Sequence, residues 1–285
     1  MKGLNKQLYE ACRNGSISAV LSLIERGADI HCRDDSDGWT PLHHACLNGH
    51  TDIALLLLDR GADIHCRDNS DGWKPLHWAC QKGHTDIALL LLDRGADSNS
   101  RDNSEWTPLL WACQKGHTDI ALLLLDRGAD IHSRDDFGRT PLLWACHNGH
   151  TDIALLLLDR GADIDSRDSY GYTPLHWACE KGRTDIALAL VRAGADTLAK
   201  NKNDQTPLDY AESEELKAAL IREREKYLAW TRRKAFMMFL VGYRHIAMGH
   251  HQPQAAAAAD HGEEEPLVDR VMRMRELNTT IASFL

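Results

Sequence analysis

The side chains that could hold a metal ion or act as nucleophiles recur in this sequence at a step of about 33 residues. Four histidines share one slot of the step, namely His50, His84, His117 and His150. Structural units stacked at such a step lie about 10 Å apart, whereas nitrogens that share a zinc ion lie about 2.0–2.1 Å from it. We therefore expect no metal site and interpret these histidines as hydrogen-bonding residues of turns.

The cysteines follow the same step, because six of the eight share one slot: Cys12, Cys46, Cys80, Cys113, Cys146 and Cys179. A disulfide needs Cα atoms within about 7 Å of each other, so this series cannot pair with itself. We expect buried, reduced thiols, which are typical of a reducing compartment such as the cytoplasm. The chain also lacks a nucleophile elbow, a phosphate-binding loop and a His-Glu-x-x-His motif, so the sequence predicts neither an enzyme nor a cofactor.

The elements that must position these residues are internal repeats. The fifteen residues 49–63 return unchanged at 83–97, 116–130 and 149–163, and altered copies lie at 15–29 and 182–196. Self-similarity at a fixed step indicates stacked units rather than one globule. A residue present in every copy therefore serves stacking, and function is expected where the copies differ.

Each unit is predicted to contain two helices and a turn. Six prolines at the repeat step mark the first helix, and all but Pro75 follow a threonine, which caps a helix whose first residue is proline. Lys74 lacks that cap. The second helix, with Ile53 followed by Ala54 and four leucines, is apolar almost all round, so it must be covered on several sides. The Asp-, Asn-, Ser- and Gly-rich stretch before the next proline predicts a turn.

In unit length, in Thr173-Pro174-Leu175-His176-Trp177-Ala178 and in every Gly-Ala-Asp, the chain resembles the ankyrin-repeat family. The resemblance implies an all-α solenoid of helix-turn-helix units with short β-hairpin loops, here with a helical C-terminal extension. We expect an N-terminal capping unit, five full units, a truncated capping unit, an extension helix, a flexible linker and an amphipathic helix: 5–36, 37–70, 71–103, 104–136, 137–169, 170–202, 203–222, 223–248, 249–266 and 267–285. We call the first seven of these units 1 to 7.

Some positions depart from the family pattern. The hairpins that end units 1 and 2 are one residue longer than the others, and Glu105 stands where four of the hairpins have glycine, namely Gly38, Gly72, Gly138 and Gly171. Leu110 and Leu143 replace the family's histidine. Asn99 occupies a hairpin slot that asparaginyl hydroxylases can modify in ankyrin proteins.

Two aromatic series remain. Trp78, Trp111, Trp144 and Trp177 fall inside the first helices, and we interpret them as a ladder of core side chains. The other series lies at the hairpin tips, which form one wall of the binding groove in ankyrin proteins. The second wall is expected at the ends of the first helices, where the units differ. The predicted partner-binding residues are Trp39, Trp73, Trp106, Phe137, Arg139, Tyr170 and Tyr172 at the tips, and Lys82, Lys115, His147 and Lys181 at the helix ends. An exposed aromatic row is typical of interface hot spots; the alternative is that the rings fold over neighbouring hairpins.

The sequence thus favours a monomeric, cytoplasmic module that binds a protein or peptide without catalysis. A net charge of −9 argues against nucleic acid. One alternative is an adaptor whose C-terminal helices dock on a second protein. A minor alternative is attachment to a membrane surface through 230–241, where Trp230 and Arg232-Arg233-Lys234 lie together.

Overall fold

The computed structural model describes residues 2–247, with side chains from Gly3 to Met237. Within this range every regular element is an α-helix. The helices are α1 (Lys2–Asn14), α2 (Ile17–Glu25), α3 (Pro41–Asn48), α4 (Thr51–Asp59), α5 (Pro75–Lys82), α6 (Thr85–Asp93), α7 (Pro108–Lys115), α8 (Thr118–Asp126), α9 (Pro141–Asn148), α10 (Thr151–Asp159), α11 (Pro174–Glu180), α12 (Thr184–Ala193), α13 (Pro207–Tyr210) and α14 (Glu214–Ala247). The predicted linker 249–266 and amphipathic helix 267–285 lie outside the described residues.

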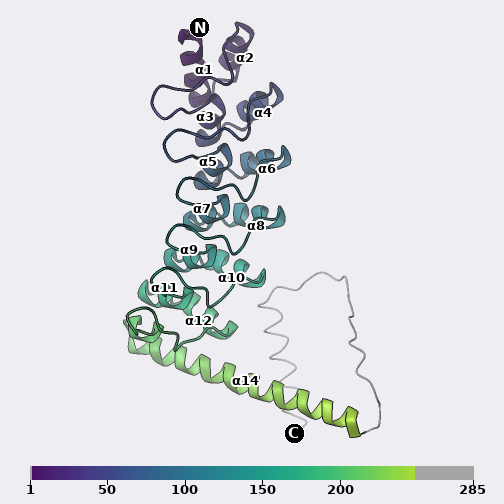
Figure 1. Ribbon diagram of the computed structural model, residues 1–285, viewed down its shortest axis with the longest axis vertical. Coiled ribbons are helices and arrows are strands. Elements are labelled where there is room, and N and C mark those ends of the chain that lie inside the picture. Colours follow the sequence, from purple (N-terminus) through teal and green to yellow (C-terminus); the bar gives the residue numbers. More distant parts are fainter. Residues whose placement is uncertain (1, 248–285) are drawn as a thin grey trace.

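The helices stack in two rows, as Figure 1 shows: α1, α3, α5, α7, α9 and α11 form one row, and their even-numbered partners form the other. The shared core lies between the rows. Ile87, Ala88 and Leu91 of α6 are 0% exposed, and the same positions are buried in α4, α8 and α10. Burial of a leucine side chain contributes about 1.5–3 kcal/mol, and each helix pair obtains that burial only from its neighbours. The predicted all-α solenoid is therefore confirmed.

The Thr-Pro starts cap the first helices as the sequence predicts. The Thr107 hydroxyl accepts a hydrogen bond from the Leu110 amide at 3.3 Å. Where the family histidine is present it adds a link to the next unit, because His43 accepts from the Thr40 amide through Nδ1 (3.1 Å) and its Nε2 lies 3.1 Å from the Trp73 carbonyl oxygen. Burial lowers the pKa of His43 to about 4, so the ring is neutral at pH 7 and Nε2 donates to that carbonyl.

The histidines of the repeated slot, His50, His84, His117 and His150, also join neighbouring units, although they were expected to serve their own turns. Nε2 of His150 lies 3.1 Å from the Gln114 carbonyl oxygen at the end of α7, and His84 and His117 make the equivalent bonds to Leu47 and Gln81. The rings lie over glycines at these helix ends: a Cβ on Gly116 would lie 2.6 Å from a ring carbon of His150. Glycine at the ends of α3, α5 and α7 thus makes room for the histidine of the next unit.

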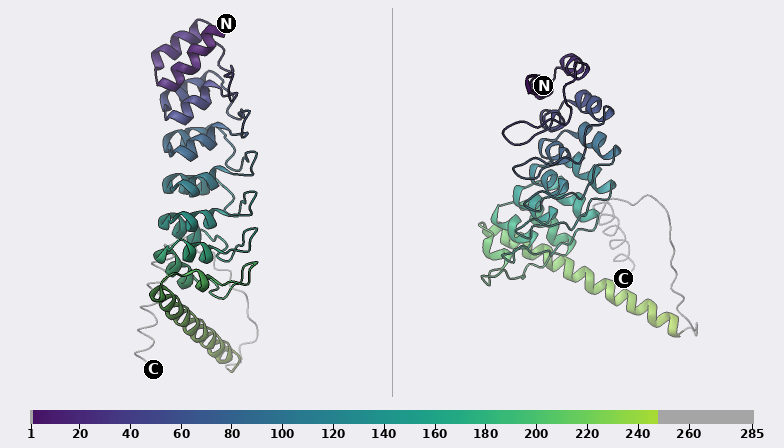
Figure 2. Two further views of the ribbon diagram at one scale, coloured as in Figure 1. Left: turned by 90° about the vertical axis from the view of Figure 1, so that its left-hand side faces the viewer. Right: turned by 45° about the horizontal axis from the view of Figure 1, so that its top comes forward.

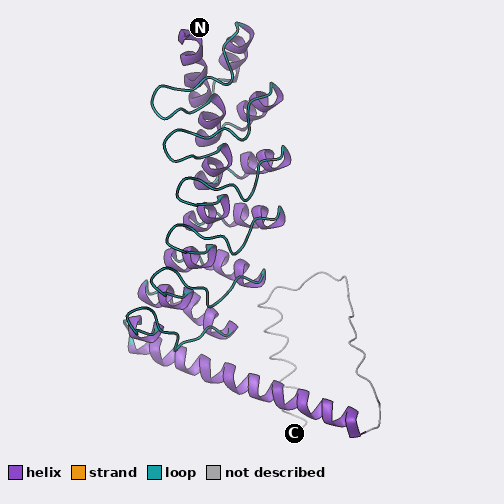
Figure 3. Ribbon diagram, in the orientation of Figure 1, coloured by secondary structure: helices purple, strands orange, loops and turns teal. Residues whose placement is uncertain are grey.

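The hairpin loops project from one side of the stack, as Figure 2 shows in its left-hand view, and they contain no strand (Figure 3). Each loop is closed by its own backbone, for example from the Asp34 amide to the Trp39 carbonyl at 3.0 Å. Neighbouring loops are joined as well: the Asn69 amide donates to Asp37 at 2.7 Å, and the Ser169 amide donates to Phe137 at 2.8 Å. These bonds join most neighbouring loops to one another beside the first helices, so the loops are not separate fingers.

Helix α14 covers the C-terminal end of the stack. Its residues Leu216 and Leu220 are buried. Nε of Arg192 in α12 lies 3.2 Å from Oε2 of Glu223 and forms an ion pair with it. Beyond this packed part the helix continues past the stack (Figure 1), where Phe236 is 60% exposed. The helix is continuous from Glu214, so the predicted cap (203–222) and extension (223–248) share it.

Candidate protein-interaction face

The two aromatic series that the sequence presents separately form one stack in the structure. Trp78 of α5 contacts the tip residue of its own loop, Trp73, with ring centroids 4.3 Å apart, and the tip residue of the preceding loop, Trp39, at 4.8 Å. Trp111 does the same with Trp106 at 4.3 Å and Trp73 at 4.5 Å. Helix and tip rings alternate, so this stack fixes each loop against the first helices of two units. The prediction of an inter-repeat ladder is confirmed, and the tip residues belong to it.

This stack removes part of the surface that the sequence suggested. Trp73 is 6% exposed and Trp106 is 9% exposed, so the expectation that they stand in an open row is wrong. Their rings lie between the tryptophans of neighbouring first helices, where they have more apolar surface to contact than at a loop tip. Trp39 and Tyr172 are half-buried, and Tyr172 is held at the C-terminal end by a hydrogen bond between its hydroxyl and that of Tyr210.

The remaining tip residues stay open. Phe137 is 51% exposed and Tyr170 is 55% exposed. They occupy the same slot in consecutive loops, two residues after the loop aspartate, and the Ser169 bond to Phe137 holds these loops together. The open aromatic surface of the loops is therefore concentrated at units 5 and 6.

An aspartate at the start of each loop positions the tip. The Asp135 carboxylate accepts hydrogen bonds from the amides of Phe137 (2.9 Å) and Arg139 (2.8 Å), and its second oxygen accepts from Nε1 of Trp144 at 3.0 Å. Asp168 repeats this pattern with the Tyr170 and Tyr172 amides and with Trp177. The loop aspartates that sequence reasoning attributed to turn geometry thus also fix the tryptophan behind the loop.

The one cationic tip residue of the predicted site lies among these rings. The guanidinium carbon of Arg139 is 4.7 Å from the centroid of Trp144 and 4.9 Å from that of Trp177. His147 meets both indoles edge-on, at 5.6 and 4.8 Å. The ammonium of Lys181 lies 5.6 Å from the Trp177 ring. The structure therefore brings Arg139, His147 and Lys181 together, and the open ring of Phe137 lies beside them with its centroid 5.5 Å from the Arg139 guanidinium carbon.

The other two predicted helix-end residues, Lys82 and Lys115, lie at the last positions of α5 and α7. They extend the face toward the N-terminus with positive charge but without open aromatic surface, because the tip tryptophans of units 3 and 4 are buried. Sequence reasoning did not find Trp144 and Trp177 as part of this face. The signal was present in their alternation with the tip residues along the repeat, but it does not show which rings meet.

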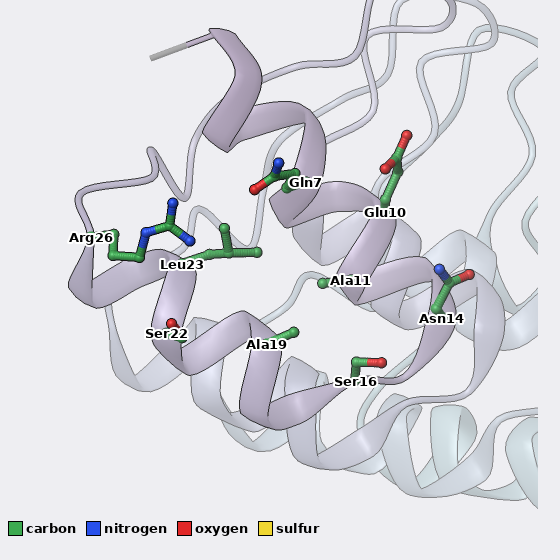
Figure 4. A pocket seen from close by; sticks show the side chains of 9 residues that line it. All are labelled: Gln7, Glu10, Ala11, Asn14, Ser16, Ala19, Ser22, Leu23 and Arg26. Carbon is green, nitrogen blue, oxygen red and sulfur yellow. The ribbon is translucent and has the colours of Figure 1, made fainter.

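A hollow of about 390 Å³ lies elsewhere, at the N-terminal end between α1 and α2 (Figure 4). Its lining combines small side chains such as Ala11 and Ala19 with one acid and one base at the rim, Glu10 and Arg26. It contains no histidine or cysteine, and among residues 3–237 no group of three or more metal-ligating side chains is present. The side chains that line this hollow therefore indicate no particular ligand or reaction.

The fold and this face define a helical repeat solenoid whose loops and first helices form two walls of an elongated surface. A family model described as ankyrin repeats (3 copies) matches residues 8–102, 68–135, 128–201 and 168–222. The chain therefore belongs to the ankyrin-repeat family, whose members are generally protein-interaction modules. Among the helices that the structure describes, none is both long and apolar enough to cross a bilayer.

Two comparisons place the chain among known proteins. The crystal structure of the human ASB11 ankyrin repeat domain is similar, with a TM-score of 0.70 and 28% identity over 76% of this chain and 96% of that chain. Protein phosphatase 1 regulatory subunit 27 from Homo sapiens and from Mus musculus is 53% identical over 36 residues, which are 13% of this chain. The match spans 23% of the length of these curated relatives, about one repeat.

Proposed function

We propose that this chain is a non-catalytic, cytoplasmic binding module that holds a protein or peptide partner along the face formed by its loops and first helices. The observation that carries the proposal is the open aromatic surface of Phe137 and Tyr170 at 51% and 55% exposure. The other large rings of the loops stand in a different slot, at the residue before Thr-Pro or Lys74-Pro75, and are buried or half-buried in the aromatic stack. Large exposed aromatic side chains are enriched at interface hot spots.

The variation between units supports the same face. The buried residues of the second helices are nearly identical from copy to copy, whereas the helix ends carry Asn48, Lys82, Lys115, Asn148 and Lys181. A specific partner requires surface positions that differ while the core stays constant. The similarity to a phosphatase regulatory subunit covers a single repeat and supports a protein partner without identifying one.

The test compares two double variants in affinity capture from a cell extract, with the captured proteins quantified by mass spectrometry. Phe137→Ser with Tyr170→Ser removes the open tip rings. Leu89→Ser with Leu122→Ser is the matched control, because these leucines of α6 and α8 are 39% and 37% exposed on the other row of helices. We expect the tip variant to lose a partner that the control retains. A partner captured equally by both variants contradicts binding at this face.

A second candidate function, an adaptor, is favoured by the part of α14 that lies beyond the stack. Tyr227 still contacts the stack, with its hydroxyl 2.6 Å from where a Cβ on Gly194 would lie. After it, Leu228, Phe236 and Met237 are 37%, 60% and 41% exposed. A single helix with exposed apolar side chains is suited to dock on another protein.

Truncation after Tyr227 tests the adaptor function, because it keeps the contacts that close the stack. An adaptor loses one of two captured partners on truncation, whereas a simple binder keeps its partner. Sedimentation of the full chain with anionic vesicles, lost on truncation, would instead indicate attachment to a membrane surface through Trp230 and the adjacent basic residues.

A further inference from the structure

The aromatic stack is interrupted by a charge at a single loop. One slot of each unit lies directly before the Thr-Pro start, or before Lys74-Pro75 in unit 3. It holds Trp39, Trp73 and Trp106 in units 2 to 4, Arg139 in unit 5, Tyr172 in unit 6 and Gln205 in unit 7. In units 2 to 4 the indole at this position fills the space between two first helices. In unit 5 a guanidinium takes that place between Trp144 and Trp177.

No described residue accepts a hydrogen bond from this guanidinium. Nε of Arg139 is buried and has no hydrogen-bond partner among the described residues. The nearest carboxylate oxygen, Oδ2 of Asp168, is 4.0 Å from Nε and already accepts from Nε1 of Trp177 at 3.1 Å. The Arg139 side chain is 18% exposed, and its terminal nitrogens donate to no described residue. A guanidinium has five N–H donors, and a buried donor left without a hydrogen bond costs free energy.

The groups that face Arg139 leave it as the open cation of this cluster. Asp135 and Asp168 lie beside it, but each accepts two loop amides and one indole. Glu180, whose charge acts on the neighbouring His147, pairs with Lys181 at 3.1 Å. His147 contacts the same two indoles. Burial, as the largest cause, and the charges of Lys181 and Arg139 lower the pKa of His147. Its hydrogen bond to Asn148 and the charge of Glu180 raise that pKa and offset part of this effect. The ring of His147 is therefore neutral at pH 7 and does not compete with Arg139 for an anion.

We propose that Arg139, held between Trp144 and Trp177, is the receptor for a carboxylate of an acidic side chain in the partner peptide. The proposal rests on the proposed function and specifies the partner chemistry at that face. A guanidinium whose faces are covered by aromatic rings presents its edge, and that edge matches a carboxylate with two parallel hydrogen bonds. Phe137 and Tyr170 then contact apolar residues of the same peptide. Phosphopeptide sites are generally built from clusters of arginines, whereas here the exposed arginines of the same loops, Arg134 and Arg167, already donate to loop carbonyls.

The experiment begins with a random-peptide display library selected on the full 285-residue chain. Enriched peptides are synthesised, and their affinities are measured by calorimetry with the intact chain and three variants. Arg139→Trp restores the residue found in units 2 to 4 and removes the charge while keeping the stack. Arg139→Lys keeps the charge but loses the planar fork, so it tests the proposal even if the tryptophan variant fails to fold. Arg160→Ala is the control, because it removes an exposed positive charge at the end of α10.

We expect the enriched peptides to share an Asp or Glu at one position. Affinity should fall roughly 30-fold or more with Arg139→Trp, fall less with Arg139→Lys, and stay unchanged with Arg160→Ala. Replacing the shared Glu by Gln in the peptide should cause a similar loss with the intact chain and little further loss with Arg139→Trp, as expected for two groups that act as a pair.

Several outcomes would overturn the proposal. Peptides that need Phe137 and Tyr170 but share no acid, or that bind the Arg139→Trp variant unchanged, contradict it and leave the proposed function intact. A phosphoserine at the shared position that binds more than tenfold tighter than Glu assigns the site to phosphopeptides instead. If no peptide is enriched and captured proteins are indifferent to the tip variant, both the carboxylate receptor and the proposed binding face are wrong.

Discussion

The loop aspartates allow a paired test of how the aromatic stack is held. Asp135 and Asp68 each accept hydrogen bonds from two loop amides, at 2.8–2.9 Å for Asp135 and at 3.0–3.1 Å for Asp68. They differ at the second carboxylate oxygen. Oδ2 of Asp135 accepts from the indole of Trp144, whereas Oδ2 of Asp68 and Nε1 of Trp78 are both buried without a partner. The loop after Asp68 is one residue longer than the loop after Asp135.

The two Asp→Asn variants should therefore differ by one hydrogen bond. Each substitution removes the negative charge that accepts hydrogen bonds from two loop amides at equivalent positions. That cost is common to both variants, so it cancels when their free energies of unfolding are subtracted. In Asp135→Asn the new amide group points a donor at the Trp144 indole N–H, so the hydrogen bond to a charged acceptor is lost. Such a bond contributes about 1.5–3 kcal/mol. In Asp68→Asn no such bond exists to lose, and a buried carboxylate oxygen without a partner is replaced by a neutral group.

The assay is urea unfolding followed by far-ultraviolet circular dichroism, with the slope of the transition compared between variants so that midpoints report stability. We expect Asp135→Asn to reduce the free energy of unfolding by about 1.5–3 kcal/mol more than Asp68→Asn. Equal losses in the two variants would refute the reasoning, because the indole bond would then contribute nothing. A larger loss for Asp68→Asn would show that the loop amides, rather than the tryptophan, set the stability of these loops.

Two further predictions follow from backbone strain and from burial. Glu105 has a φ of 62°, which costs a non-glycine residue about 1–2 kcal/mol, and its exposed ion pair with Arg101 offsets at most part of that cost. Glu105→Gly should therefore raise the free energy of unfolding by roughly 1 kcal/mol in urea titrations. A loss of stability in this variant would contradict the strain. Burial lowers the pKa of His43 to about 4, so from about pH 6.5 downward the unfolded chain binds a proton there that the folded chain does not. Stability should therefore fall between about pH 6.5 and 4, and His43→Leu, which introduces the side chain that Leu110 and Leu143 have in the same slot, should make that pH dependence shallower; an unchanged slope would show that His43 is not responsible.

Much of the fold could be predicted because the residues that start, end and pack each helix lie within a single repeat. The Thr-Pro starts, the glycines at helix ends and the apolar second helices predict the same two-helix unit, and the structure contains it at those positions. The loops were less predictable. Glycine stands at the tight turn in four of them, but the bonds that join one loop to the next, as from Ser169 to Phe137, pair residues of different repeats.

The candidate face was predicted only in part, for a reason visible in its residues. Phe137 and Tyr170 are open as expected, whereas Trp73 and Trp106 are buried, although all are large aromatic side chains near equivalent tips. The two pairs occupy different slots, because Trp73 and Trp106 stand two residues before the proline that starts the first helix, whereas Phe137 and Tyr170 lie two residues after the loop aspartate. The spacing shows both slots, but only contacts between residues of different units, such as Trp73 with Trp111, show which slot lies in the stack.

The sequence by itself determined the repeat, the two helices of each unit, the need to stack and the positions where units differ, because capping, glycine conformation and apolar periodicity act within a few residues. Only the tertiary structure decided which of the differing side chains are exposed and which fill the stack. It also placed Arg139 between two tryptophans of successive helices with its donors unused. Burial and hydrogen-bond pairing are properties of neighbours in space, and in a solenoid those neighbours come from the adjoining units.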